Sequence, residues 1–176
     1  MSCIASASYD GTIRIWDVYT WTVRNVLSME GPVIRVVFHP SLNQLASAGG
    51  GKDITIWDLD SSCPILTLKG HSAAVYEVCY SSDGTQLASR SYDKSVIVWD
   101  SATGAEIARL VCEGGSCPCT LRYSEDGGKL IVGYRDAHIR VWDTNTWQVS
   151  SVLTSHRSAV KDLCVPWISR GGGYVL

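Results

Sequence analysis

The dipeptide Trp-Asp recurs at a nearly constant interval along this chain of 176 residues, and this repeat constrains the fold more than any other feature. Successive tryptophans of these pairs are 41, 42 and 43 residues apart. The four pairs are Trp16-Asp17, Trp57-Asp58, Trp99-Asp100 and Trp142-Asp143. The first and third pairs also end two similar stretches, "SASYDGTIRIWD" at 6–17 and "SRSYDKSVIVWD" at 89–100. A fixed period of this length indicates an array of similar units, each packed on its neighbours.

Each unit contains apolar runs that alternate with period two and are separated by Ser, Pro, Asp and Gly. Alternation of this kind predicts strands, and the residues between the runs predict the turns of hairpins. A period of about 40–45 residues that ends in Trp-Asp is typical of a four-stranded propeller blade. The expected strands are 3–7, 11–16, 22–28, 33–38, 43–47, 53–57, 63–68, 74–80, 85–90, 95–99, 105–110, 118–123, 129–133, 138–142 and 148–153, with a further inner strand at 159–165.

Composition and charge narrow the classes of function. Hydrophobic residues make up 45% of the chain, so a packed core is expected. The 15 Lys and Arg are spread over the units and balanced by 17 Asp and Glu, which gives no electrostatic footprint for nucleic acid or an anionic membrane. The seven scattered Cys and the lack of a signal-peptide pattern favour a reducing compartment, the cytoplasm or the nucleus.

Four Trp-Asp pairs in register make the chain resemble the WD40 repeat family over residues 3–165, and residues 68–100 are close to a consensus unit. The resemblance implies an all-β fold, a WD40-type β-propeller of about four four-stranded blades, either partial or small. Residues 1–166 would form the blades, as four repeats plus a terminal inner strand. Residues 167–176 would form an irregular C-terminal tail.

The resemblance also implies a polar network that pins the inner hairpin of each blade. Its members in the family are a His, a Ser or Thr, an Asp and the Trp of Trp-Asp. The third unit carries the full set, which is His71, Ser89, Asp93 and Trp99. These side chains can satisfy one another because Trp donates, Asp accepts, and Ser and His can each do both.

The other units depart from this set. The first unit carries Ser6, Asp10 and Trp16 but no histidine. The second keeps Ser47 and Trp57 but has Met29 and Gly51 in the other places. The fourth keeps Asp136 and Trp142 but has Gly114 and Val132, so Asp136 is expected to be partly stranded. Two units are therefore expected to carry the network, and two to have lost it.

The ends of the chain leave three arrangements open. His156 follows His71 by 85 residues, so pairing of residues 159–165 with residues 3–7 would bring His156 to Ser6, Asp10 and Trp16 and close a four-bladed ring. The chain could instead be a fragment or truncated relative of a larger propeller. A homodimer could also complete a larger propeller, with half-blades meeting across a two-fold axis.

The sequence favours a protein without catalysis or cofactors. Asp10, Asp93 and Asp136 fall one to a blade, which argues against a paired acid–base site. The Gly runs at 49–51 and 171–173 lack the strand–helix context of a phosphate-binding loop. Cys112, Cys117 and Cys119 could bind zinc or act as redox-sensitive thiols, but their spacing is not that of a structural zinc site.

The family binds partners through the rim of its central opening, and this resemblance carries over to particular positions here. The predicted partner-binding residues are Tyr9, Tyr76, Tyr92, Arg135 and Lys161. Tyr and Arg are enriched at interface hot spots. The expected function is a non-catalytic scaffold that mediates protein–protein interactions within a multiprotein complex, with proteins or peptides as partners. Alternatives are a spliceosome-associated WD-repeat subunit, a zinc- or redox-regulated protein acting through residues 112–119, and a truncated paralogue with no independent function.

Overall fold

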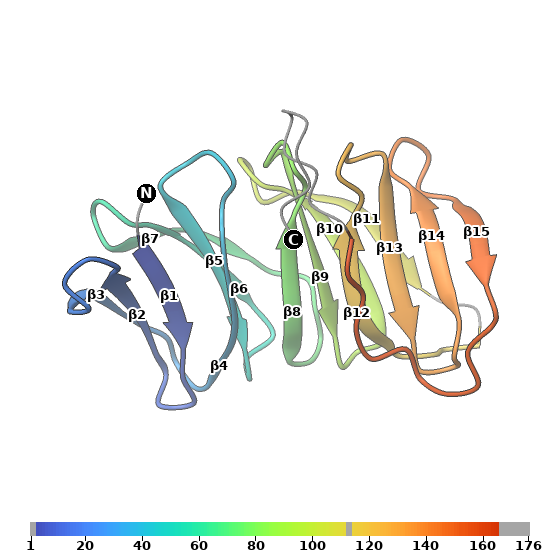
Figure 1. The fold of residues 1–176 in the computed structure, drawn as a ribbon, viewed down its shortest axis with the longest axis horizontal. Coiled ribbons are helices and arrows are strands. Elements are labelled where there is room, and N and C mark those ends of the chain that lie inside the picture. Colours follow the sequence, from blue (N-terminus) through green and yellow to red (C-terminus); the bar gives the residue numbers. More distant parts are fainter. Residues whose placement is uncertain (1–2, 112–113, 166–176) are drawn as a thin grey trace.

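A computed structural model describes residues 3–111 and 114–165, and over these residues the chain forms four antiparallel sheets in sequence order. Figure 1 shows the sheets side by side, from the first at the left to the fourth at the right. The first sheet has the order β1–β2–β3: β1 (Cys3–Ala7), β2 (Thr12–Asp17) and β3 (Val23–Ser28). The second has the order β4–β5–β6–β7: β4 (Val33–Phe38), β5 (Gln44–Gly49), β6 (Ile54–Asp58) and β7 (Cys63–Leu68).

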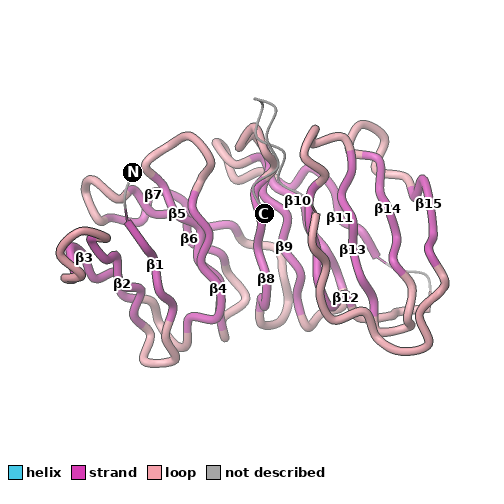
Figure 2. Tube along the Cα trace, in the orientation of Figure 1, coloured by secondary structure: helices cyan, strands magenta, loops and turns pink. Residues whose placement is uncertain are grey.

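The third and fourth sheets repeat the same meander. The third contains β8 (Val75–Tyr80), β9 (Gln86–Ser91), β10 (Ser95–Asp100) and β11 (Glu106–Val111). The fourth contains β12 (Pro118–Tyr123), β13 (Lys129–Tyr134), β14 (Ile139–Asp143) and β15 (Val149–Leu153). The strand-and-loop trace in Figure 2 shows these strands joined by loops alone. These fifteen strands begin and end within two residues of the expected positions, and the all-β, WD40-type propeller architecture is confirmed.

The hydrophobic core lies between successive sheets. Three buried clusters fill the three junctions, and each contains the tryptophan of the later sheet: Trp57, Trp99 and Trp142. Trp16 belongs to the first described sheet and is half-buried. The register is the same in all four sheets, because each of these tryptophans pairs across the sheet with an apolar residue of the preceding strand: Ile4, Leu45, Leu87 and Leu130. The four indoles therefore occupy equivalent places.

The aspartate of each Trp-Asp pair holds the turn that follows it, a role that the sequence reasoning missed. Asp100 Oδ1 accepts hydrogen bonds from the backbone N–H of Ala102 and of Thr103, at 3.1 and 2.7 Å. Asp17, Asp58 and Asp143 accept equivalent bonds from their own turns. A carboxylate that accepts backbone N–H groups two and three residues on stabilises a tight turn, which explains why the dipeptide recurs as a pair.

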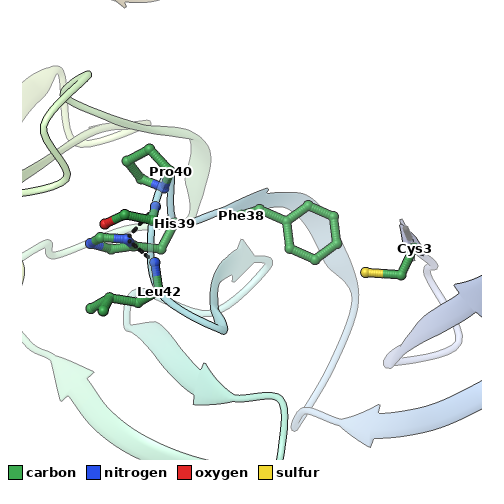
Figure 3. Close-up of a pocket in the computed structure, with 6 residues that line it drawn as sticks. Cys3, Phe38, His39, Pro40 and Leu42 are labelled. Atoms are coloured by element: carbon green, nitrogen blue, oxygen red, sulfur yellow. Dashed lines mark hydrogen bonds between the residues drawn. The ribbon is translucent and has the colours of Figure 1, made fainter. Parts of the chain in front are cut away.

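His39 joins the second and third sheets. Figure 3 shows its ring beside Pro40 and Leu42 of the β4–β5 turn, and all three residues line a pocket of about 290 Å³. Nδ1 accepts hydrogen bonds from the backbone N–H of Ser41 and of Leu42, and Nε2 donates to the carbonyl oxygen of Gly84 at 3.1 Å. Gly84 has φ +76°, and a Cβ there would lie 2.3 Å from the His39 ring. Nδ1 thus stabilises the β4–β5 turn, and Nε2 links that turn to the third sheet.

The terminal inner strand expected at 159–165 is not present, so this expectation is wrong for the single chain. These residues adopt no strand, and Val160 N–H donates to the carbonyl oxygen of Tyr134 at 3.0 Å. The segment lies against the fourth sheet, whereas β1 lies at the other end of the array (Figure 1). A strand needs a partner along its length, and residues 3–7 are too far away to supply one. The tail expected at 167–176 lies outside the described residues.

Residues 3–111 and 114–165 include no helix that is both long and apolar enough to cross a membrane.

Candidate functional site

The polar network of the third sheet connects four side chains: two from strands β9 and β10, one from the turn between them, and one from the loop before β8. Trp99 Nε1 donates to Ser89 Oγ at 2.8 Å, and Ser89 Oγ lies 2.8 Å from His71 Nε2. His71 Nδ1 lies 2.9 Å from Asp93 Oδ2. If Nδ1 carries the ring hydrogen, it donates to Asp93, while Nε2 accepts from Ser89. This tautomer gives each of these buried groups a partner and ties the inner hairpin to the preceding loop.

The electrostatics of the network keep His71 neutral and Asp93 ionised. Burial lowers the pKa of His71 below its ordinary value of 6.5, although Asp93 acts in the opposite direction. Burial raises the pKa of Asp93, but hydrogen bonds from Ser95, Ser72 and His71 outweigh it and bring this pKa to about 2. Both groups bind protons more readily in the unfolded chain, so acidification below the ordinary histidine pKa weakens this sheet.

The first sheet assembles part of the predicted set. Trp16 Nε1 donates to Ser6 Oγ at 2.9 Å, as in the third sheet. Asp10 Oδ1 instead accepts from the N–H and the hydroxyl of Thr12, at 2.8 and 2.6 Å. His156 does not join these residues, because it is exposed in the segment that follows β15 of the fourth sheet. Its expected place beside Ser6, Asp10 and Trp16 is therefore wrong for the single chain.

The second sheet keeps more of the network than the sequence predicts. Trp57 Nε1 donates to Ser47 Oγ at 2.8 Å. Ser47 Oγ in turn lies 3.1 Å from Met29 Sδ, so a thioether occupies the place of the histidine. Sulfur is a weak acceptor, but it is apolar enough to be buried without a further partner. The sequence signal was present, since Met29 stands at the histidine position.

In the fourth sheet the stranded group is the tryptophan rather than Asp136. Arg140 Nη2 donates to Asp136 Oδ2 at 2.8 Å, and the backbone N–H of His138 donates to Oδ1 at 3.1 Å. Trp142 Nε1 is buried and has no hydrogen-bond partner among the described residues. The cause is Val132, which stands where the other three sheets have serine. An unpaired buried donor costs about 1–3 kcal/mol.

We expect Val132→Ser to repair this defect. Val132 is fully buried and pairs with Arg140, as Ser89 pairs with Ile97, so a hydroxyl there would face Trp142 Nε1. The matched control is Val132→Ala, which also removes methyl groups but supplies no acceptor. Denaturant unfolding should show the Ser variant to be more stable than the Ala variant by about 1–2 kcal/mol. A Ser variant less stable than the Ala variant would contradict the assignment.

Four of the five predicted partner-binding residues line one cleft between the third and fourth sheets. We call this the rim cleft; it has a volume of about 370 Å³. Its main lining residues are Tyr76, Arg90, Tyr92, Cys117, Arg135 and Lys161. The turns after β9 and β13 lie at the lower end of the molecule in Figure 1, where the arrowheads of both strands point. Tyr9 lies apart from the cleft, in the turn after β1, and its side chain is 79% exposed.

The two tyrosines form an aromatic surface on one wall of the rim cleft. The rings of Tyr76 and Tyr92 lie 6.1 Å apart between centroids, and the guanidinium of Arg90 lies 5.9 Å from the centroid of the Tyr76 ring. The side chain of Arg90 is held in place because its Nε donates a hydrogen bond to Glu77 Oε2 at 2.9 Å. Aromatic pairs and cation–π contacts at these distances are favourable, so the wall is ordered before a partner arrives.

Glu77 is a buried charge that the sequence reasoning did not identify. Its carboxylate accepts hydrogen bonds from Arg90 and Arg122, and Arg35 lies 4.0 Å away. These arginines come from β4, β9 and β12, so one carboxylate joins the second, third and fourth sheets. The available signal was a glutamate inside the apolar run of an inner strand, since such a charge is rarely buried unless it is paired.

The cysteine segment gives no support for a metal centre in the part of the chain that the structure describes. Within residues 3–111 and 114–165, no group of three or more His, Cys, Asp or Glu side chains is placed to hold a metal ion. Cys117 and Cys119 line the rim cleft, and Cys112 lies outside the described residues.

Comparison with known proteins agrees with this architecture. The family model described as "WD domain, G-beta repeat" matches residues 1–17, 62–100 and 108–143. Nuclear distribution protein nudF 1 of Talaromyces marneffei is 38% identical over 73% of this chain and 28% of its own length. COMPASS component SWD3 of Saccharomyces cerevisiae is 29% identical over 80% of this chain and 47% of its own length.

A further relative is DENN domain and WD repeat-containing protein SCD1 of Arabidopsis thaliana, which is 28% identical over 89% of this chain and 13% of its own length. The chain thus spans less than half the length of these relatives. Because the family model covers more than half of the chain and the four sheets repeat one register, this chain belongs to the WD-repeat family.

Proposed function

We propose that this chain is a non-catalytic scaffold that binds protein or peptide partners through the rim cleft, as part of a multiprotein complex. The observation that carries the proposal is the convergence of Tyr76, Tyr92, Arg135 and Lys161 on one cleft. These residues are far apart in sequence, and they are of the types that dominate binding energy at interfaces. The support of Tyr76 and Tyr92 is rigid, since the polar network and Glu77 hold the strands of the third sheet.

The names of two relatives point the same way. COMPASS component SWD3 and transcription initiation factor TFIID subunit 5 of Caenorhabditis elegans are named as parts of larger complexes. We extend to this chain the role of a complex component, acting in the nucleus or the cytoplasm, with proteins rather than nucleic acid or a membrane as direct partners. Homodimerisation that completes a larger propeller is a further proposal, and native mass measurement tests it.

Within the described residues, no contact favours the spliceosomal, zinc- or redox-regulated, or non-functional paralogue alternatives. The experiment therefore tests whether residues of the rim cleft bind the partners. Quantitative affinity capture from cells, followed by mass spectrometry, compares the wild-type chain with Tyr76→Ala combined with Tyr92→Ala. Each truncation should cost about 1–2 kcal/mol of binding, so recovery of specific partners should fall at least about tenfold.

The matched control is Tyr19→Ala combined with Trp21→Ala, because these rings are 79% and 69% exposed and lie outside the rim cleft. This control should retain the partners, and both double variants should unfold at the same temperature as the wild type. Equal recovery by the rim-cleft variant and the wild type would contradict the proposal. Equal losses in both double variants would assign the binding to a wider surface.

A further inference from the structure

Cationic side chains that are scattered in the sequence converge around the rim cleft. Lys94, Arg135, Arg157 and Lys161 line the cleft or the two pockets that adjoin it, whose volumes are about 520 and 530 Å³. The three pockets adjoin one another at Arg135, which lines all of them, and we treat them as one site. We call this the basic trough. It concentrates positive charge on a chain whose net charge is −2.

Within residues 3–111 and 114–165, no ion pair neutralises the charge of the basic trough. None of its four cationic side chains forms an ion pair with another described residue within 4.0 Å. Asp136 also lines two of the pockets, but Arg140 holds it at 2.8 Å. Unpaired cations on concave surfaces raise the local concentration of anions, so the trough attracts negatively charged groups.

The distribution of the cations indicates the form of the anion. Lys94 follows β9, Arg135 follows β13, and Arg157 and Lys161 belong to the segment after β15. Three separate segments thus contribute charge along the trough. A single doubly charged group would contact the cations at only one end of the trough. An extended chain with single charges spaced along it, at about 3.3 Å per residue, would contact the cations of all three segments.

The aromatic wall indicates that the partner also carries apolar side chains. Tyr92 is 70% exposed and Tyr76 is 37% exposed, and both line the rim cleft together with Arg135 and Lys161. Exposed tyrosines next to arginine offer both apolar area and hydroxyl groups to a peptide. Nucleic acid offers more charge, but the net negative charge of the chain opposes a long polyanion.

We propose that the basic trough recognises an extended acidic peptide segment of the partner protein, with Asp or Glu carboxylates on the cations and an apolar side chain on Tyr76 and Tyr92. This inference rests on the proposed function and names the chemical class of the partner. Arg135 lies at the centre of the site, since it lines every pocket of the trough.

Fluorescence anisotropy with the full chain tests the inference. The probe is a labelled peptide of about twelve residues made of Glu, Asp and Leu, which spans about 40 Å when it is extended. Comparison peptides replace the acidic residues with Gln or with Lys, or carry one phosphoserine among Gln and Leu. A single-stranded oligonucleotide of similar length completes the set. The acidic peptide should bind at least tenfold more tightly than every other probe, and added salt should weaken its binding.

Charge reversal then locates the site. Arg135→Glu combined with Lys161→Glu should weaken the acidic peptide at least tenfold, as should the milder Arg135→Gln with Lys161→Gln. The control, Arg24→Glu with Lys69→Glu, changes two exposed cations outside the trough and should bind like the wild type. Thermal unfolding identifies any variant that fails to fold. If the glutamate variant fails to fold, the affinity of the Arg135→Gln, Lys161→Gln variant is compared with that of the wild type instead.

Three outcomes would overturn the inference: equal binding by the trough variants and the wild type, tightest binding of the phosphoserine peptide, or tightest binding of the oligonucleotide. None of these would remove the proposed scaffold function, which the Tyr76 and Tyr92 variants test independently through partner recovery. Loss of partner recovery without acidic-peptide binding would leave the rim cleft as the binding site and reject an acidic partner.

Discussion

Replacing Ser89 with alanine is expected to lower the free energy of unfolding by about 3 kcal/mol, because it leaves two buried polar atoms unpaired. Ser89 is fully buried and accepts from Trp99 Nε1 while it donates to His71 Nε2, each at 2.8 Å. Trp99 and His71 are 1% and 4% exposed, so the cost of taking both atoms from solvent is left uncompensated when the hydroxyl is removed. Denaturant unfolding at neutral pH, followed by tryptophan fluorescence, measures the loss.

Ser6→Ala is the matched control for this prediction. It removes the same hydroxyl from the same position of the first sheet, where Trp16 Nε1 donates at 2.9 Å. There the serine is exposed, the tryptophan is half-buried, and no histidine joins them. Water can replace the lost bond, so the expected cost is below about 1 kcal/mol. Equal losses in the two variants would show that the network of the third sheet adds nothing to stability beyond one surface hydrogen bond.

The second large effect is expected for Glu77→Gln, which should destabilise the fold by about 2–4 kcal/mol. The substitution keeps the shape of the side chain but removes the charge that faces Arg35, Arg90 and Arg122. Because Glu77 is 6% exposed, the three guanidinium groups would then repel one another across the junctions of three sheets. The loss should shrink as salt is added, since these arginines are partly exposed and the repulsion is screened.

Glu106→Gln provides the comparison for Glu77→Gln. Glu106 pairs with Arg109 at 2.6 Å, but both side chains are more than a third exposed. Exposed ion pairs contribute about 0–1 kcal/mol, so this variant should unfold almost like the wild type. A Glu77→Gln variant as stable as Glu106→Gln would mean that the arginines find other partners, and the inter-sheet role of Glu77 would be lost.

Much of the fold could be predicted from the sequence because its determinants are local. The period of Trp-Asp gave the number of sheets, and alternation with turn residues gave the strands, since both depend on residues close together in the chain. The strand expected at 159–165 failed for the opposite reason. Its residues have the right alternation, but a strand also needs a partner edge, and no pattern within 159–165 reports where residues 3–7 lie.

The candidate site was less accessible to sequence reasoning. The positions of Tyr76 and Tyr92 in the repeat predicted them as partner-binding residues, and the structure places their rings side by side. Glu77 escaped because its partners come from three sheets, and their convergence depends on how the sheets pack. The fourth sheet shows a further limit: Asp136 found a partner in Arg140, four residues on, whereas Trp142 depended on one residue of the adjacent strand.

The uneven polar networks of the third and fourth sheets give the rim cleft two unlike walls. One wall rests on a hairpin whose indole, hydroxyl, imidazole and carboxylate are all satisfied, and the other on a hairpin whose buried indole N–H has no acceptor among the described residues. Local opening is easiest where buried groups gain hydrogen bonds by meeting solvent. We therefore expect the wall of the cleft on the fourth sheet to open more readily than the wall on the third sheet, a difference that hydrogen exchange would detect.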